Sequence, residues 1–381
     1  MRMSVSERIF KSKETADGAL AIDWWVLNDA DSAGVPSLFG DERVRFSEKL
    51  AVFIDHDTPC GSVEAALLQK ELIAFAERQG AVLFNGQGVS YQLMLDRFVR
   101  EGEVVATCSP HAPLFGAVGA LGVTLSPEAF ARSLLEGTCR APRPETVCVV
   151  LESPPAVSAK DVILNLIGIA GDSLKGRSVA FVGEGAAALT LSERIVICQL
   201  INETGALSAF FPDGPMPEGT APLFAIDLST VSPMIAGPNT PRRVLPAREL
   251  QGLALDEVFI GGCSGGRIED LRAAAKILKG GKVAHPLRLL VAPATTEAFV
   301  QAADEGLLTT FMDAGAIVMN QGCSVCWGRS QGIVDAGETL LSSGSRCFPG
   351  AAGSEAADIY LCSPVVAAFS ALAGKISVGE D

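Results

Sequence analysis

Residues 261–272 have the sequence GGCSGGRIEDLR, and they decide how the rest of the chain is interpreted. A second stretch, residues 320–326, has the sequence NQGCSVC and brings a CxxC pair. The first stretch predicts a glycine-rich turn that leads into a helix, and the second predicts another turn. Three cysteines delivered from such loops are what an iron–sulfur cluster with one open iron requires.

Spacing alone leaves other interpretations of these cysteines open. The pair Cys323 and Cys326 could be a redox-active dithiol, with Cys263 an unrelated buried thiol. All three could instead form an incomplete zinc site. The residues by themselves therefore indicate a thiol-rich metal or redox site and do not select among these chemistries.

The length and composition predict a multidomain globular protein. The chain has 381 residues, of which 48% are hydrophobic and 19% charged, so two or three domains with sizeable cores are expected. Its formal net charge of −14 argues against nucleic-acid binding, which needs a basic face. A local arginine pocket could still bind an anionic small substrate.

Cysteine usage and the apolar pattern predict the cellular environment. The ten cysteines are scattered without the spacing of a disulfide framework, and the first residues lack the apolar region of a signal peptide. No apolar run is long enough to span a membrane. We expect a cytoplasmic protein with reduced thiols, in which a cysteine cluster favours metal binding or catalysis.

Apolar runs alternate with segments of helical spacing along most of the chain, which predicts an α/β fold with largely parallel sheets. Residues 4–45 look irregular apart from a short helix over 6–13, and the proline-rich residues 212–248 look like an extended linker. The predicted strands cover residues 50–54, 81–84, 104–107, 147–151, 178–182, 256–260, 287–291 and 316–319.

Several segments resemble one known family. Residues 262–271, GCSGGRIEDL, resemble the GSCTNGRIEDL segment of isopropylmalate isomerase large subunits, which belong to the aconitase superfamily. Residues 322–326 resemble that family's GCSMC segment, and residues 158–164, SAKDVIL, are similar to its TAKDIIL segment. The dipeptide Asp55-His56 falls at the family's D-H pair, and the likeness continues from about residue 45 to the C-terminus.

The resemblance implies a fold and a cofactor. The fold would be three α/β domains of the aconitase type, at residues 1–143, 144–236 and 237–381, around a central iron–sulfur site. A 4Fe–4S cluster would be held by Cys263, Cys323 and Cys326, with one iron lacking a protein ligand. The mobile fourth domain of the family is not in this sequence, which implies a separate small subunit with a swivelling domain.

The resemblance also implies an activity, because members are hydro-lyases that act on small hydroxy acids. His56 and His111 match family histidines near the cluster, and Asp55 would orient His56 as an acid–base partner. Each histidine could otherwise be a structural residue satisfied by hydrogen bonds. Arg346, with Ser345 beside it, matches an arginine of the family's NRNFxGR loop and would bind a substrate carboxylate, although a surface arginine is the alternative.

The chain departs from the family at several positions around the expected site. Tyr91 stands where the family has histidine and could replace it as an acid, and the DSHT segment has become Ser-Pro-His-Ala around His111. The second arginine of the NRNFxGR loop falls at Ala351, and a family glutamate falls at Ala180 or Phe181. These changes, in a chain shorter than ordinary large subunits, predict a small carboxylic-acid substrate other than isopropylmalate.

Two further hypotheses remain open from the sequence. The loss of acid–base residues could instead mark a cluster-bearing paralogue that has lost hydration activity or performs another reaction on the same scaffold. A third interpretation is a cluster-free binding protein whose CxxC pair holds zinc.

Overall fold

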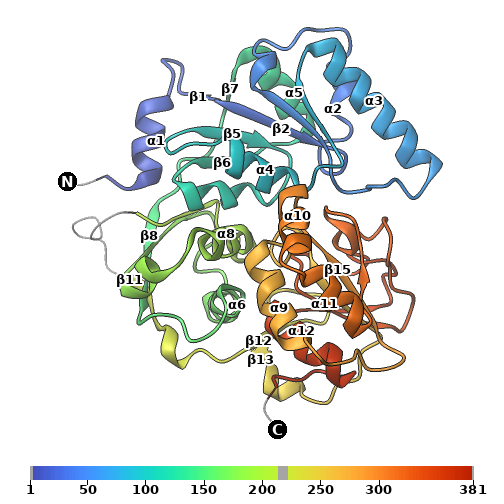
Figure 1. Cartoon of the computed structure of the whole chain (residues 1–381). Helices are drawn as coiled ribbons and strands as arrows, with labels where there is room; N and C mark the ends of the chain where they lie inside the picture. Colours follow the sequence, from blue (N-terminus) through green and yellow to red (C-terminus); the bar gives the residue numbers. More distant parts are fainter. Residues whose placement is uncertain (1–2, 213–221, 380–381) are drawn as a thin grey trace.

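Three large sheets with packed helices, and a two-stranded antiparallel sheet of β1 and β7, form the described part of the chain, which is residues 3–212 and 222–379 of a computed structural model. Each large sheet makes one lobe, with the β1-β7 pair in the first, and the colours of Figure 1 separate the lobes in sequence order from blue through green to red. The prediction of an α/β protein with largely parallel sheets is therefore confirmed. Its division into domains ending at residues 143 and 236 remains our proposal.

The first lobe contains a five-stranded parallel sheet in the order β4-β3-β2-β5-β6. Its central strand β2 has the sequence WWVLN and is buried along its whole length, so the prediction of an irregular stretch before residue 45 is wrong here. A strand buried on both faces shows no alternation of polar and apolar residues, and only its short apolar run could have indicated it. The elements are α1 (Val5–Lys13), β1 (Leu20–Ala21), β2 (Trp24–Asn28), α2 (Val35–Phe39), η1 (Ser47–Lys49), β3 (Leu50–Ile54), α3 (Val63–Gln79), β4 (Val82–Asn85), α4 (Ser90–Arg97), β5 (Val104–Thr107), η2 (Ala112–Val118), β6 (Leu121–Thr124), α5 (Pro127–Glu136) and β7 (Thr138–Cys139).

The second lobe is a four-stranded parallel sheet in the order β10-β9-β8-β11. Strand β11 lies within the predicted linker and pairs with β8, so the linker prediction is wrong for this part, while residues 213–221 lie outside the described residues. The elements are β8 (Thr146–Glu152), α6 (Ala159–Ala170), β9 (Ser178–Val182), α7 (Glu184–Ala188), α8 (Leu191–Leu200), η3 (Ile201–Thr204), β10 (Ser208–Phe210), β11 (Pro222–Asp227) and η4 (Leu228–Thr230).

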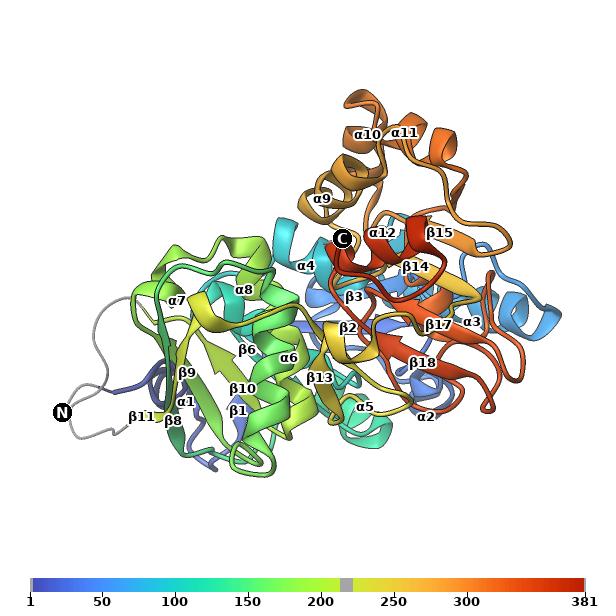
Figure 2. The same cartoon turned by 90° about the horizontal axis from the view of Figure 1, so that it is seen from below.

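The third lobe is a seven-stranded sheet in the order β13-β12-β18-β17-β14-β15-β16. Its five last-named strands pair in parallel, whereas β12 pairs antiparallel with both of its neighbours. Figure 2 shows β13 beside helix α6, where the third sheet meets the second lobe. The elements are β12 (Met234–Ala236), β13 (Val244–Pro246), η5 (Ala247–Leu250), β14 (Glu257–Gly261), α9 (Ile268–Leu278), β15 (Arg288–Ala292), α10 (Thr296–Asp304), α11 (Leu307–Ala314), β16 (Ile317–Val318), η6 (Ser324–Trp327), β17 (Thr339–Ser342), β18 (Asp358–Leu361) and α12 (Pro364–Ala373).

The lobes share a continuous core. One buried cluster runs from Phe53 and Tyr91 in the first lobe, through Ile163 and Phe181 in the second, to Cys263 in the third. A glycine permits the closest approach between the first two lobes, since a Cβ on Gly116 would lie 1.7 Å from the carbonyl oxygen of Ala209. The loops between the lobes are therefore held in fixed positions by packing.

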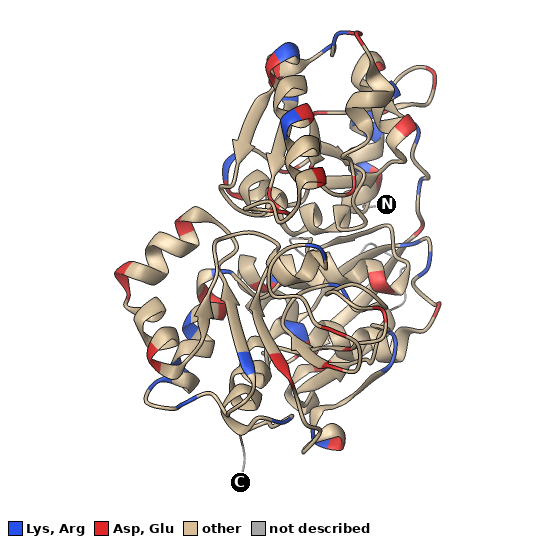
Figure 3. Cartoon of the chain, turned by 90° about the vertical axis from the view of Figure 1, so that its right-hand side faces the viewer, with Lys and Arg blue, Asp and Glu red and all other residues tan. Residues whose placement is uncertain are grey.

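Charge and hydropathy agree with this architecture. In the view of Figure 3, acidic and basic segments alternate over the described chain without gathering into a basic face. Among the described helices, none is both long and apolar enough to cross a membrane.

Candidate metal centre and active site

The three candidate cysteines, His56, His111 and Arg346 all follow strands that pair in parallel with their neighbours. Cys263 comes after β14, the CxxC pair after β16 and Arg346 after β17. In the first lobe, His56 comes after β3 and His111 after β5. Because ligands of open α/β sheets bind at the carboxyl ends of strands, this arrangement brings chemically active side chains from two lobes to one place.

The three candidate cluster ligands are buried and unpaired. Cys263, Cys323 and Cys326 are 5%, 7% and 8% exposed, and none forms a disulfide. The Ser345 hydroxyl lies 3.3 Å from the sulfur of Cys263 and 3.8 Å from that of Cys326. Burial raises the pKa of Cys323 to about 12, so this thiol needs a cation nearby to become a thiolate. We call residues 261–266, 322–326 and 343–345 the cysteine cradle.

Two side chains of the second lobe reach the cysteine cradle. The amide nitrogen of Gln199, on α8, donates a hydrogen bond of 2.6 Å to the sulfur of Cys263. The ammonium group of Lys160, on α6, donates to the hydroxyl of Ser264 at 2.7 Å and to the carbonyl of Gly344 at 2.6 Å. Burial lowers the pKa of Lys160, and the nearby thiol of Cys263 opposes that effect. Lys160 therefore holds a buried positive charge beside the sulfurs, for which anionic thiolates are the natural partners.

The CxxC loop is fastened to the first lobe through its backbone. The backbone N–H of Cys323 donates a 3.0 Å hydrogen bond to the carbonyl of Asp55. Gly322 precedes it with φ +140°, and a Cβ there would lie 2.8 Å from the same carbonyl oxygen. Only glycine combines this backbone conformation with so close an approach, so the cradle depends on Gly322.

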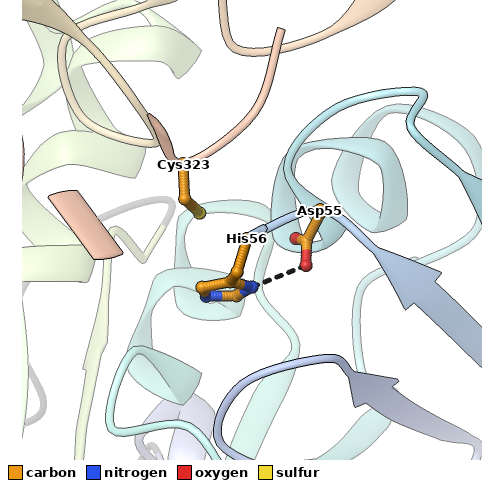
Figure 4. Close-up of side chains that lie close together, drawn as sticks. All are labelled: Asp55, His56 and Cys323. Carbon is orange, nitrogen blue, oxygen red and sulfur yellow. Dashed lines mark hydrogen bonds and ion pairs between the residues drawn. The ribbon is translucent and has the colours of Figure 1, made fainter. Parts of the chain in front are cut away.

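A buried chain of acids fixes His56. Asp29 accepts hydrogen bonds from the backbone N–H groups of Asp55 and His56, at 3.2 and 3.0 Å, and so shapes the loop after β3. A carboxylate oxygen of Asp55 lies 2.7 Å from the Nδ1 of His56, and a dashed line marks this contact in Figure 4. Burial alone would lower the pKa of His56, but the carboxylate of Asp55 and the thiol of Cys323 raise it well above its ordinary value. His56 is therefore held protonated, with its Nε2 as the ring nitrogen not engaged by Asp55.

Asp55, His56 and Cys323 also lie close enough to hold a single metal ion, since their ligand atoms fall within 4.8 Å of one another. The carboxylate of Asp55 is already engaged, however, by the His56 ring and by a 2.6 Å hydrogen bond from the backbone N–H of Ser90. A hydrogen-bonded pair that points at the sulfur of Cys323 explains these contacts better than a separate metal site does.

His111 has the opposite character from His56. Its Nε2 lies 3.5 Å from the hydroxyl of Ser345, and its Nδ1 is buried without a hydrogen-bond partner among the described residues. Burial, reinforced by the positive charge of Arg346, lowers the pKa of His111 to about 3. The imidazole is therefore neutral at physiological pH and can accept a hydrogen bond.

Tyr91 packs behind His111, with their ring centroids 6.3 Å apart. Its hydroxyl accepts a 2.8 Å hydrogen bond from the amide of Asn28, and burial raises its pKa. The tyrosine is thus close to the site, but its arrangement suits support of His111 better than proton donation. Its role as a replacement acid stays a prediction.

Arg346 opens onto a hollow of about 310 Å³ beside the cysteine cradle, which we call the Arg346 hollow. The guanidinium lies over the ring of Trp327 at 5.0 Å and within 3.4 Å of both carboxylate oxygens of Asp31. Besides two prolines, the hollow is lined by Asp31, His111, Glu203, Arg346, Cys347 and Phe348.

The sequence indicates that a family glutamate is lost, because its position falls at Ala180 or Phe181, but Glu203 brings a carboxyl group to the hollow. Ala180 and Phe181 are buried within β9 as part of the second sheet, while Glu203 supplies a carboxyl group to the hollow. Its pKa is raised by burial. A signal was present: Gln199 and Glu203 are polar residues four apart in a mostly apolar segment, the first on α8 and the second on the 3-10 helix η3 that follows it. Asp29 and Asp31 could not be assigned to the site from the sequence, because β2, the strand that precedes them, is not predicted from the sequence either.

The residues of the cradle fit an iron–sulfur cluster. They offer three buried unpaired thiols, a soft donor set that suits iron–sulfur centres, and a buried cation in Lys160 that offsets thiolate charge. The buried oxygen of the Gln199 amide and the Nδ1 of His111 have no partners within the described chain. Fold and site thus define an α/β protein with a buried group of three thiols between its lobes.

The chain belongs to the aconitase family. The family described as "Aconitase family (aconitate hydratase)" matches residues 51–215 and 221–374, so the chain is a hydro-lyase of the aconitase and isopropylmalate dehydratase type. The 3-isopropylmalate dehydratase large subunit 2 of Pyrococcus furiosus is 33% identical to it over 99% of each chain. The homoaconitase large subunit of Thermus thermophilus is 36% identical over 88% of this chain and 86% of that one.

A solved structure shares the fold at much lower sequence identity. The holo-form of aconitase X from Thermococcus kodakaraensis superposes with a TM-score of 0.56 and 12% identity, covering 100% of this chain and 98% of the other. At this identity the likeness supports the fold alone.

Proposed function

We propose that this chain is the iron–sulfur subunit of a two-subunit hydro-lyase that adds or removes water on a small hydroxy acid other than isopropylmalate. The observation that carries the proposal is a group of three buried thiols, two of them on the hydroxyl of Ser345 and the third beside His56, with one charged and one neutral histidine next to them. Each of these groups has a use in moving water and a proton at a hydroxy acid.

The proposed cofactor is a 4Fe–4S cluster on Cys263, Cys323 and Cys326, and when bound its open iron supplies a Lewis acid for a substrate hydroxyl and carboxylate. His56, which is held protonated by Asp55, would offer its Nε2–H to the oxygen that leaves as water. His111 is uncharged and can accept a hydrogen bond from the substrate. Ser345 would position groups between the sulfurs and His111.

The relatives supply the reason to propose a partner. Both relatives named above are described as large subunits. We therefore infer a separate small subunit with a swivelling domain, which would close over the site and contribute the base that takes a proton from carbon. We also propose a cytoplasmic location, which suits a centre built on reduced thiols.

Glu203 favours catalysis over the alternative of an inactive paralogue. The sequence alone suggests that the acidic group has been lost, yet the half-buried carboxyl of Glu203 lines the hollow beside His111. A carboxyl whose pKa is raised by burial is a candidate acid–base group. The residues left in place are thus still an acid–base set.

The test is anaerobic reconstitution of the full chain with iron and sulfide. We expect a brown protein with broad visible absorbance and close to four irons per chain, as a 4Fe–4S cluster requires. Cys323→Ala should abolish the absorbance, because it removes one of three ligands. Cys139→Ala is the matched control, since Cys139 is a buried unpaired thiol in the first lobe, away from the cradle. A colourless wild-type protein, or one that binds zinc in preference to iron, would contradict the proposal.

A further inference from the structure

We infer that the substrate's second polar group, the one that enters the Arg346 hollow, donates hydrogen bonds and carries no negative charge, as an ammonium or hydroxyl group does. The inference rests on the proposed function, which assigns one substrate carboxylate to the metal centre. It narrows the substrate class from hydroxy acids in general to monocarboxylic hydroxy acids with an amino or hydroxyl substituent.

Arg346 already has an anionic partner within the chain. One guanidinium nitrogen lies 3.4 Å from each carboxylate oxygen of Asp31, and the two side chains are only 14% and 19% exposed. The ring of Trp327 covers a face of the guanidinium, with 5.0 Å between the Cζ atom and the ring centroid. A substrate carboxylate would therefore have to separate Arg346 from Asp31 and leave that carboxylate without its partner in a largely buried position.

The residues that line the hollow carry no surplus positive charge with which to attract an anion. Asp31 balances Arg346, and His111 is neutral. Glu203 adds a second carboxyl, which accepts a 3.3 Å hydrogen bond from the amide of Asn202. If Glu203 is ionised, the hollow is negative; if it is protonated, the hollow is neutral. Neither state favours a carboxylate, and both offer carboxyl oxygens to a hydrogen-bond donor.

The sequence around the hollow agrees with this charge balance. The position that corresponds to a second family arginine is Ala351, which is 2% exposed and has no polar side-chain atoms. One arginine thus faces two acids where a dicarboxylate would require unpaired cations. The Nδ1 of His111, at the edge of the same hollow and unpartnered within the described residues, is a further polar atom left for a ligand. Repulsion of the wrong charge is a recognised source of specificity.

Three probes that differ only in the group distal to a 2-hydroxy carboxylate test the inference. They are malate, glycerate and isoserine, which carry a carboxylate, a hydroxyl and an ammonium group. Binding is measured by titration calorimetry on the full chain, both after cluster reconstitution and before it. We expect isoserine and glycerate to bind about tenfold or more tightly than malate, because like charges repel in the hollow.

Substitution of Asp31 supplies the second half of the test. Asp31→Asn should improve malate binding and weaken isoserine binding, shifting their ratio by about tenfold or more, because it frees the charge of Arg346. Asp304→Asn is the matched control, since it makes the same charge change at an exposed position of helix α10 and should leave the ratio unchanged. Cluster content and thermal melting of each variant are measured alongside.

Three outcomes would overturn the inference. They are tighter binding of malate in the wild type, an unchanged ratio in a folded Asp31→Asn variant, and no binding of isoserine or glycerate in either state of the chain. The charges of the hollow come from protein side chains, so the ranking is expected before reconstitution as well, with weaker affinities. Failure of the proposed function is read separately, as absence of a cluster after reconstitution.

Discussion

The cysteine cradle and the Arg346 hollow lie side by side but are built in different ways. The cradle comes from short runs of one lobe, in which glycines let the backbone pass close to its neighbours. The ionisable side chains of the hollow come from all three lobes: Asp31 and His111 from the first, Glu203 from the second and Arg346 from the third. The part that would hold a cofactor is local in sequence, and the part that would select a substrate is not.

This difference explains how one chain can keep its metal chemistry while its substrate changes. A side chain of the hollow can be replaced without moving the backbone, because it reaches the hollow from the end of an independently packed strand or helix. A change in the cradle has to preserve backbone hydrogen bonds such as that between Cys323 and Asp55. We therefore expect changes in the cradle to affect cofactor binding or stability and changes in the hollow to affect selectivity.

The largest effect should come from Gly322→Ala. The added methyl would lie 2.8 Å from the carbonyl oxygen of Asp55 at a backbone φ of +140°. Strain at such a position costs about 1–3 kcal/mol, and loss of the hydrogen bond from Cys323 to Asp55 adds about 1 kcal/mol. We expect the free energy of unfolding to fall by about 3 kcal/mol and the cluster to be lost, as measured by urea denaturation and by iron content.

A variant at a second glycine separates the effect of the steric clash at Gly322 from the effect of the strained backbone conformation. Gly280 has φ +78°, and a Cβ added to it would have no heavy atom within 4 Å, so Gly280→Ala should cost about 1 kcal/mol and leave the cluster in place. Equal losses of stability in the two variants, with iron retained in both, would show that the cradle does not depend on the approach to Asp55.

A smaller effect, on the pH dependence of the free energy of unfolding, is expected from Glu257. This residue lies at the start of β14, at the opposite end of that strand from Cys263. Burial raises the pKa of Glu257 to about 7, although a 2.9 Å ion pair with Arg288 opposes the shift. Between about pH 4.5 and pH 7 the unfolded chain loses this proton while the folded chain keeps it. The contribution of Glu257 to stability is therefore present below that interval and lost as the pH rises through it.

Glu257→Gln should remove this pH dependence. We expect the wild type to lose about 2–3 kcal/mol of unfolding free energy relative to the variant between about pH 5 and pH 8. The check is urea denaturation of the cluster-free proteins across that range. Parallel pH profiles would mean that the carboxyl ionises normally. Cluster content should be the same in both proteins, because the substitution lies outside the cradle and the hollow.

The cradle could be predicted well from the sequence and the hollow poorly, for physical reasons. Cysteines in glycine-rich turns after strands carry a local signal, and the predicted strands at residues 104–107 and 178–182 coincide with β5 and β9. His56 and Asp55 also stand out, because they directly follow a strongly apolar strand. Each of these features depends on residues that are neighbours in the chain.

The missed residues depend on contacts between distant segments. Asp31 has no local feature that indicates an arginine far along the chain, and the strand before it, β2, looks irregular in the sequence. Lys160 has no signal beyond the family resemblance of its segment, since a lysine on a helix is ordinarily expected at the surface. Its 2% exposure and its bonds to Ser264 and Gly344 follow from the packing of α6 against the third lobe. Such packing cannot be read from local periodicity.

The smallest predicted effect concerns Lys160, which connects the second lobe to the cradle. Replacing a buried charge by an apolar side chain of similar length often changes stability little, because the cost of desolvation disappears with the charge. Lys160→Met should therefore fold, but the thiolates would lose their buried cation. We expect the reconstituted cluster to be lost to an iron chelator about tenfold faster, which corresponds to about 1.4 kcal/mol.

Two further variants show whether loss of the positive charge of Lys160 causes the faster loss of the cluster. Lys160→Gln keeps a hydrogen-bond donor for Ser264 or Gly344 but removes the charge, so it should lose its cluster nearly as fast as Lys160→Met. Lys276→Met makes the same substitution at an exposed position of α9 and should behave like the wild type. If Lys160→Gln retains its cluster as the wild type does, Lys160 acts through hydrogen bonds alone. The positive charge would then contribute nothing to the cradle, and the cluster's thiolates would be stabilised by the donors from Gln199 and Ser345.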